Sequence, residues 1–213
     1  ATGFKTTLES SEVLESKTVI YTAGAAHRKL TVLGSEKFDK EEFPTVHPVT
    51  EPPFLPEKDV AVIGGGNSAL DDALLLSEIC NKVYLIHRRA EFRGDASTLE
   101  KLEQKENVEI IRNAKVQEIV GEKKAEKLLL DTGVTLEIQG IFVAIGMIPQ
   151  TEAVKDLVTL DESGYIKAGE DGITSESGFF VAGDVRTKEL RQIQSPQPQD
   201  GANAVKFSNT VYY

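Results

Sequence analysis

The sequence predicts an α/β protein in which a three-layer domain that carries a β-meander is flanked by further strand-containing segments on both sides. Two observations lead to this fold class. The aliphatic stretch 60–63 runs directly into a glycine-rich turn, and then into a helix-like stretch that ends at Cys80. A second aliphatic stretch, 82–86, follows this helix, so the elements come in the order strand, turn, helix and strand.

The chain before this unit divides into two parts. Residues 1–43 are expected to form strands and turns, with strands at 4–8 and 17–21. Residues 44–58 contain five prolines, which exclude both a helix and an interior strand. We therefore interpret 44–58 as a linker, and the central domain as residues 59–146.

The remaining elements of the central domain follow in order along the chain. A charged stretch indicates a helix at 96–105, and an apolar one indicates a strand at 108–111. The continuous apolar run 141–146 is typical of a strand that is buried on both faces. Between them, three short segments predict the β-meander: 116–120, 127–131 and 134–138.

The last part of the chain, residues 147–213, returns to strands. These are expected at 165–167 and 179–182. A stretch rich in Gln and Pro follows at 194–199, after which we expect Asp200 to cap a final helix.

The glycine-rich turn matches a dinucleotide-binding pattern. Gly64, Gly66 and Ala69 occupy the G-x-G-x-x-G/A positions after a strand and at the start of a helix. Gly64 permits the tight turn, Gly66 lets the backbone approach a pyrophosphate, and Ala69 lets the helix pack closely on the sheet. Asn67 and Ser68 can add hydrogen-bond donors at the helix N-terminus, where anions bind. The domain is therefore predicted to be Rossmann-like and to bind NAD(P).

A basic cluster follows the second strand of this unit. His87, Arg88 and Arg89 stand where an NAD-selective site usually places an acid for the ribose 2′-hydroxyl, and Arg93 comes soon after. Guanidinium groups bind phosphate oxygens through paired, charge-assisted hydrogen bonds. The cluster therefore favours NADPH over NADH.

Each half of this interpretation has a simpler alternative. A glycine run after a strand is often only a turn, and arginines often form a solvated surface cluster. The strand before the turn, the helix after it and the placement of the arginines at the end of the second strand favour a nucleotide site.

Composition limits the other possibilities. The chain has 213 residues and a net charge of −10, which argues against nucleic acid or an anionic membrane as a partner. Its single cysteine, Cys80, excludes an internal disulfide, and none of its three histidines stands at metal-binding spacing, so no metal site is expected. No apolar run is long enough to span a bilayer, and no signal peptide is recognised, so a cytoplasmic protein is expected.

The chain resembles the C-terminal two-thirds of the bacterial low-molecular-weight NADPH-dependent thioredoxin reductases. The resemblance implies that 59–146 is an NADPH domain inserted into a domain of the FAD-binding type, of which 1–43 and 147–213 are parts. The matching segments run in the order of that family and at close to its spacing: 62–69, 87–89, 92–93, 142–146, 149, 181–185 and 191–193.

The same resemblance implies roles for individual residues. Arg88, Arg89 and Arg93 match ligands of the 2′-phosphate, whereas Ile145 and Gly146 match the loop beside the nicotinamide ribose. On the FAD side, one aspartate matches a ligand of the ribityl chain and three later residues match the lining of the isoalloxazine ring: Asp184, Arg191, Gln192 and Ile193.

Three departures from the family pattern bear on activity. The family's redox-active C-x-x-C falls on 47–50, where His47 and Thr50 replace the cysteines, so no catalytic residue is assigned and no dithiol exchange is expected. No second glycine fingerprint for FAD occurs in 1–43, and prolines follow Ile193 where the family has a helix. Tight binding of FAD by this chain alone is not expected, whereas a weak or shared site stays open.

Three functional hypotheses follow. The first is an NADPH-binding module that cannot itself reduce disulfides. The second is an enzyme that uses FAD, with a partner protein supplying the missing segment, and passes electrons from NADPH to an acceptor other than a disulfide. The third is a non-catalytic interaction protein.

Overall fold

The computed structural model describes residues 3–38, 56–122 and 124–187. The chain forms two compact units, which we call unit 1 (residues 1–26 and 147–213) and unit 2 (residues 27–146). The predictions for residues 47–50, 191–193 and 194–213, and most of the predicted linker at 44–58, lie outside the described residues.

Unit 2 is built on a parallel sheet with the strand order β11–β5–β6–β7. The strands are β5 (Asp59–Gly64), β6 (Lys82–His87), β7 (Val108–Arg112) and β11 (Gly140–Ala144). Val60, Ala61 and Val62 are completely buried. A strand that is covered on both faces needs apolar residues at consecutive positions, and this explains the unbroken aliphatic run of β5.

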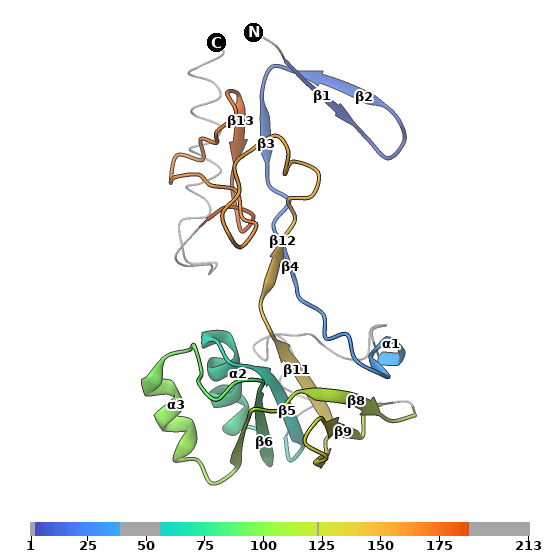
Figure 1. Ribbon diagram of the computed structural model, residues 1–213, viewed down its shortest axis with the longest axis vertical. Helices are drawn as coiled ribbons and strands as arrows, with labels where there is room; N and C mark the ends of the chain where they lie inside the picture. The colour runs from blue at the N-terminus through green and yellow to red at the C-terminus, as the bar shows by residue number, and fades with distance from the viewer. Residues whose placement is uncertain (1–2, 39–55, 123, 188–213) are drawn as a thin grey trace. The chain divides into compact units, whose positions relative to one another are not determined.

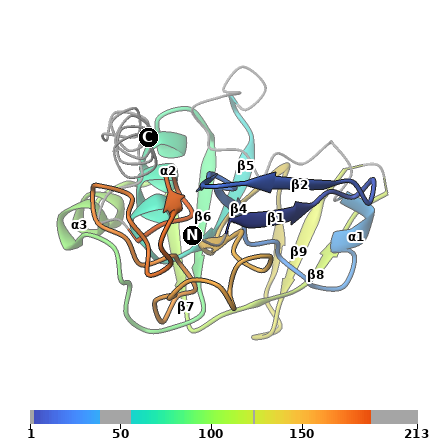
Figure 2. The same ribbon diagram turned by 90° about the horizontal axis from the view of Figure 1, so that it is seen from above.

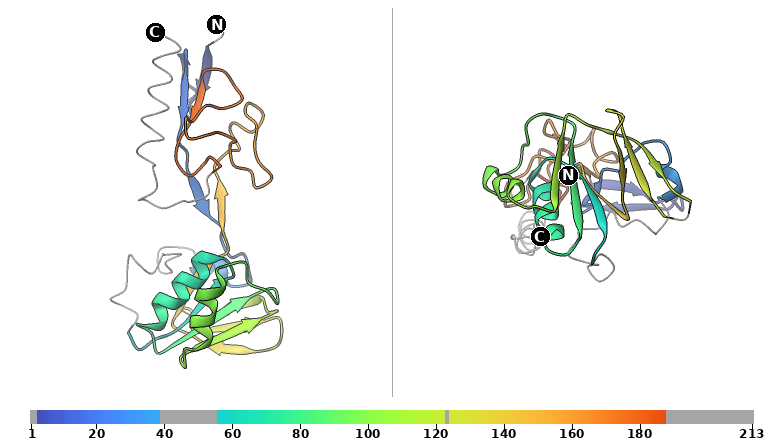
Figure 3. Two further views of the ribbon diagram at one scale, coloured as in Figure 1. Left: turned by 90° about the vertical axis from the view of Figure 1, so that its left-hand side faces the viewer. Right: turned by 90° about the horizontal axis from the view of Figure 1, so that it is seen from below.

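Two helices cover one face of this sheet (Figures 1 and 3). They are α2 (Asn67–Ser77) and α3 (Ala96–Glu103). Leu70, Leu76 and Leu102 have no exposed surface and pack in one cluster with Val60 and Val62 of β5. The apolar positions of α2 therefore hold the helix on the sheet and fix its N-terminus at the end of β5.

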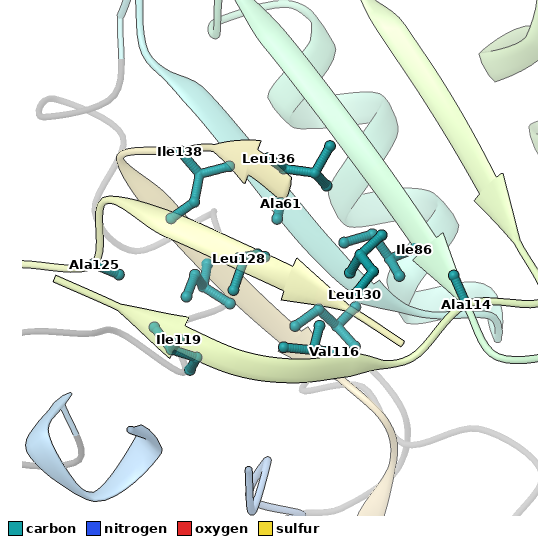
Figure 4. Close-up of a cluster of buried hydrophobic side chains, with 12 residues drawn as sticks. Ala61, Ile86, Ala114, Val116, Ile119, Ala125, Leu128, Leu130, Leu136 and Ile138 are labelled. Carbon is teal, nitrogen blue, oxygen red and sulfur yellow. The ribbon is translucent and has the colours of Figure 1, made fainter. Parts of the chain in front are cut away.

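A three-stranded antiparallel meander covers the other face (Figure 1). Its strands are β8 (Val116–Val120), β9 (Lys127–Leu130) and β10 (Thr135–Glu137). Figure 4 shows side chains of the meander, among them Leu128 and Leu130, next to Ala61 and Ile86 of the parallel sheet. The predicted three-layer, Rossmann-like domain with a β-meander is thus confirmed.

The segment before the predicted linker also belongs to unit 2. The short helix α1 (Ser35–Phe38) follows Leu33, whose carbonyl accepts a hydrogen bond of 2.9 Å from the N–H of Ile119. Gly34 has a φ of +84°, and a Cβ there would overlap the carbonyl oxygen of Ile119. The boundary between the units therefore lies after residue 26, whereas the sequence division kept 1–43 together.

Unit 1 has a smaller sheet and its own core. The strand β3 (Val19–Tyr21) pairs in parallel with β13 (Phe179–Val181). Phe179 and Val181 pack with Val154, Val158, Ile166 and Val185 in one buried cluster.

The other strands of the chain are short. The hairpin of β1 (Phe4–Thr7) and β2 (Val13–Ser16) is visible in Figure 2, and β4 (Ala25–His27) pairs with β12 (Met147–Pro149). The prediction of a strand at 165–167 is wrong, because Ile166 forms only isolated β-bridges, to Leu160 and Arg186. Within the described ranges, no helix combines the length and the apolarity that crossing a membrane requires.

The layered core of unit 2 makes a testable prediction. Leu128→Ala should lower the free energy of unfolding by about 2–5 kcal/mol, because the removed atoms leave a cavity between the meander and the sheet. Leu75→Ala is the matched control, because Leu75 is 38% exposed on α2, and it should cost about 1 kcal/mol or less. Urea denaturation followed by circular dichroism measures both. Equal costs would contradict this account of the core.

Candidate functional site

The predicted nucleotide-binding residues lie at one edge of the parallel sheet. Gly64 ends β5 and is paired in register with Ala144, which ends β11. His87 ends the neighbouring strand β6. Because parallel strands end at the same edge, the residues that follow these three strands come together next to the N-terminus of α2.

The glycine turn is tightly packed at its first position and open at its third. A Cβ on Gly64 would lie 2.7 Å from Cβ of Ala69 and would overlap the carbonyl oxygen of Ala144. A Cβ on Gly66 would meet nothing within 4 Å. Gly64 and Ala69 therefore serve close packing, whereas the space above Gly66 is free for a ligand.

Gly65, to which the sequence analysis gave no role, is the residue that accommodates His87. His87 is only 5% exposed, and a Cβ on Gly65 would overlap its imidazole ring. The ring nitrogen Nε2 of His87 lies 3.0 Å from the carbonyl oxygen of Glu91, to which it donates when it carries the proton. His87 thus supports the turn from beneath and does not stand with the arginines at the surface.

The three arginines of the cluster are exposed and available. Arg88 and Arg89 directly follow β6, and Arg93 lies in the same loop. In the part of the chain that the structure describes, none of their guanidinium groups forms an ion pair, whereas Arg112 is 2.6 Å from Glu103. The geometry therefore leaves these positive charges free for an anionic ligand.

Several contacts hold this loop in place. The N–H groups of Asn113 and Ala114 donate to the carbonyl oxygens of Arg89 and His87, at 3.3 and 3.1 Å. The ring of Phe92 lies 4.7 Å from that of His87 and 5.4 Å from the guanidinium carbon of Arg112. Asn113 has a φ of +56°, a conformation that Asn adopts more readily than most residues.

Asn67 has a role in the free protein that the sequence did not predict. The prediction that Asn67 and Ser68 add donors for the phosphates concerns other atoms, and both residues are exposed at the start of α2. In the structure Oδ1 of Asn67 accepts a hydrogen bond of 2.8 Å from the N–H of Asp95. The carboxylate of Asp95 caps α3, and the hydrogen bonds from Ser97 and Thr98 lower the pKa of Asp95.

The last part of the site follows β11. Ile145 is half-buried against the meander cluster, and Gly146 is exposed with a φ of +105°. The carbonyl oxygen of Gly146 accepts a hydrogen bond of 2.9 Å from the N–H of Arg28. The structure thus brings Ile145 and Gly146 to the same sheet edge as the glycine turn.

Of the four residues that the resemblance assigns to FAD, the structure describes one, Asp184. Asp184 is half-buried in the loop after β13, next to Gly183, which has a φ of +83°. Arg191, Gln192 and Ile193 lie outside the described residues, as do His47 and Thr50. In the described ranges, no group of His, Cys, Asp and Glu side chains is arranged to hold a metal ion.

The fold and this geometry agree with the comparisons to known proteins. The family described as pyridine nucleotide-disulphide oxidoreductase matches residues 2–205. The chain belongs to this family. It is 40% identical over 194 residues to an alkyl hydroperoxide reductase subunit of Staphylococcus aureus strain MRSA252, and the match covers 89% of this chain and 38% of that protein.

Solved structures support the same family assignment. The thioredoxin reductase of Lactococcus lactis is 29% identical, with a TM-score of 0.76, and the match covers 99% of this chain and 74% of that one. The thioredoxin reductase of Streptococcus pyogenes is 33% identical, with a TM-score of 0.69 and coverages of 95% and 68%. The resemblance to thioredoxin reductases that the sequence predicted is therefore confirmed.

The packing around the glycine turn makes a prediction about stability. Gly65→Ala should lower the free energy of unfolding by about 1–3 kcal/mol, because the new methyl group displaces the ring of His87. Gly66→Ala is the matched control, because its methyl group enters open space at a φ of −101°, and it should cost less than about 1 kcal/mol. Thermal unfolding of both variants measures the difference, and a larger cost for Gly66→Ala would refute it.

Proposed function

We propose that unit 2 binds NADPH as the pyridine nucleotide of this oxidoreductase family. The observation that carries the proposal is the placement of three exposed arginines, which have no ion pair among the described residues, next to an open glycine turn at the sheet edge. A dinucleotide phosphate needs a backbone that it can approach, and a 2′-phosphate needs guanidinium groups. The glycine turn meets the first requirement, and the arginines of the loop after β6 meet the second.

The helix α2 supplies the second part of the argument. Its N-cap residue is Gly66, which offers no side chain to the N–H groups of the first turn. The first N–H groups of a helix lack partners within the helix and carry its positive dipole end. The pyrophosphate of the dinucleotide would therefore bind here, beside Gly66, with Ser68 at the same helix end.

The roles of the remaining residues follow from their places. Arg88, Arg89 and Arg93 would bind the 2′-phosphate, and Ile145 with Gly146 would contact the nicotinamide ribose. When bound, NADPH supplies a hydride from its nicotinamide ring, and the chain's own residues hold and orient the dinucleotide. His87 would act only indirectly, through the shape of the turn.

FAD does not enter this proposal. The resemblance implies it, but Asp184 is the one candidate contact among the described residues. The chain spans 38% of the length of the alkyl hydroperoxide reductase protein that it matches, so the activity and partners of such longer proteins are separate hypotheses. The proposed function therefore rests on the pyridine nucleotide alone.

The arginine pair provides the direct test. Replacing both Arg88 and Arg89 by Ala should weaken NADPH binding by about 10- to 100-fold, and should change NADH binding by about twofold or less. Isothermal titration calorimetry of both nucleotides gives the two affinities. Replacing the exposed Lys101 and Lys115 by Ala removes the same charge elsewhere in unit 2, and should alter neither affinity. An equal loss for NADPH and NADH would refute recognition of the 2′-phosphate.

We also propose that this chain does not reduce disulfides by itself. Its single cysteine, Cys80, is only 6% exposed and packs in the core cluster that includes the buried side chains of α2. Burial, with a smaller contribution from the carboxylate of Asp59, raises the pKa of the Cys80 thiol to about 11. A thiol with so little thiolate is a poor nucleophile, and disulfide exchange needs a second thiol to complete a cycle.

This second proposal has its own measurement. With NADPH, FAD and a small aromatic disulfide, the chain should consume NADPH no faster than Cys80→Ala does. In the absence of NADPH, the thiol should react with the same disulfide much faster after denaturation than in the folded chain, because unfolding exposes the sulfur atom and restores the ordinary thiol pKa. Turnover that disappears in Cys80→Ala would overturn the proposal.

A further inference from the structure

The loop that carries the arginines is fastened to the glycine turn. We call residues 88–95 the arginine loop. The N–H groups of Arg93 and Gly94 donate to the carbonyl oxygen of Gly65, at 2.7 and 3.2 Å. The N–H of Asp95 donates to Oδ1 of Asn67 at 2.8 Å. The two bonds to Gly65 join backbone groups, whereas the bond from Asp95 is accepted by a side chain, that of Asn67. Of these three bonds, it is therefore the one that a substitution can remove directly.

The position of Asn67 makes this bond informative. Asn67 is the first residue of α2, directly after the N-cap Gly66, and it lies next to the open space above that glycine. Its amide oxygen reaches across to the arginine loop over a separation of 28 residues along the chain. The side chain thus links the predicted pyrophosphate site to the loop that carries Arg93.

The far end of the link is also fixed. Asp95 receives hydrogen bonds from the N–H of Thr98 at 2.9 Å and from Oγ of Ser97 at 2.5 Å, and so caps α3. Next to it, a Cβ on Gly94 would lie 2.5 Å from Cδ1 of Leu70 and 3.0 Å from the carbonyl carbon of Gly66. The loop therefore lies against the start of α2, where a small displacement would move Arg93 relative to Gly66.

We propose that Asn67 is a positioning residue that sets the preference for NADPH over NADH. It holds the end of the arginine loop at the place where the guanidinium group of Arg93 meets the 2′-phosphate of a dinucleotide whose pyrophosphate lies at Gly66. This inference rests on the proposed function of unit 2. NADH has no 2′-phosphate and does not use the arginine loop, so its binding depends on the glycine turn and not on the link.

The variant Asn67→Ala in the full chain tests the proposal. We expect NADPH affinity to fall by about five- to tenfold and NADH affinity by about twofold or less, measured by calorimetry with each nucleotide. Hydrogen exchange in the unliganded protein is the structural readout. The amide of Asp95 should lose protection in Asn67→Ala and keep it in Asn67→Asp, whose carboxylate still accepts the same hydrogen bond.

A double-mutant cycle with Arg93→Ala separates positioning from direct contact. If Asn67 acts through Arg93, then Asn67→Ala should cause little further loss of NADPH affinity when Arg93 is already replaced. Losses that are equal for NADPH and NADH, or fully additive with Arg93→Ala, would overturn the positioning role. A parent chain with no preference for NADPH would overturn the proposed function itself. A selective parent chain whose preference survives Asn67→Ala would overturn only this inference.

Discussion

The candidate site depends on two places where the backbone leaves no room for a Cβ atom. At Gly64 the chain passes close to the carbonyl of Ala144 and to Ala69, so β5, β11 and α2 approach one another closely. At Gly65 it passes over the buried ring of His87. Because Gly65 lies so close to β6, its carbonyl oxygen can accept hydrogen bonds from the loop that follows this strand. The position of the arginine loop is thus set by the packing of the backbone around Gly65, and not by the charges of the arginine side chains.

The arginine cluster is positively charged, whereas the chain as a whole carries a net negative charge. The chain has 34 acidic and 24 basic residues, yet the described part gives Arg88, Arg89 and Arg93 no ion pair. Ion pairs that involve exposed lysines and arginines occur elsewhere in unit 2, for example between Arg112 and Glu103 at 2.6 Å. An acidic surface repels anions in general, so an anion is favoured chiefly where several arginines lie together.

The sequence was a good guide wherever one pattern decided one element. The aliphatic run of β5, the glycine turn and the three short strands of the meander predicted the layers of unit 2 and the edge that carries the site. It could not show that His87 points beneath the turn, because a strand-end residue has the same local pattern whether its side chain is buried or exposed. The bond between Asn67 and Asp95 was equally hidden, since it joins residues that only the packed fold brings together. The middle glycine of Gly64-Gly65-Gly66 was the one local signal that could have indicated a close neighbour.

The N-terminus of α2 has a thermodynamic consequence. Gly66 gives this helix no side-chain cap, and the side chain of Asn67, the next residue, is engaged with the arginine loop. A bound pyrophosphate would therefore act as the missing cap. Ligand binding and helix stability would then be one linked equilibrium, in which the dinucleotide raises the melting temperature of the unit that recognises it. A dinucleotide bound at Gly66 would then complete a helix terminus for which the N-cap residue supplies no side chain.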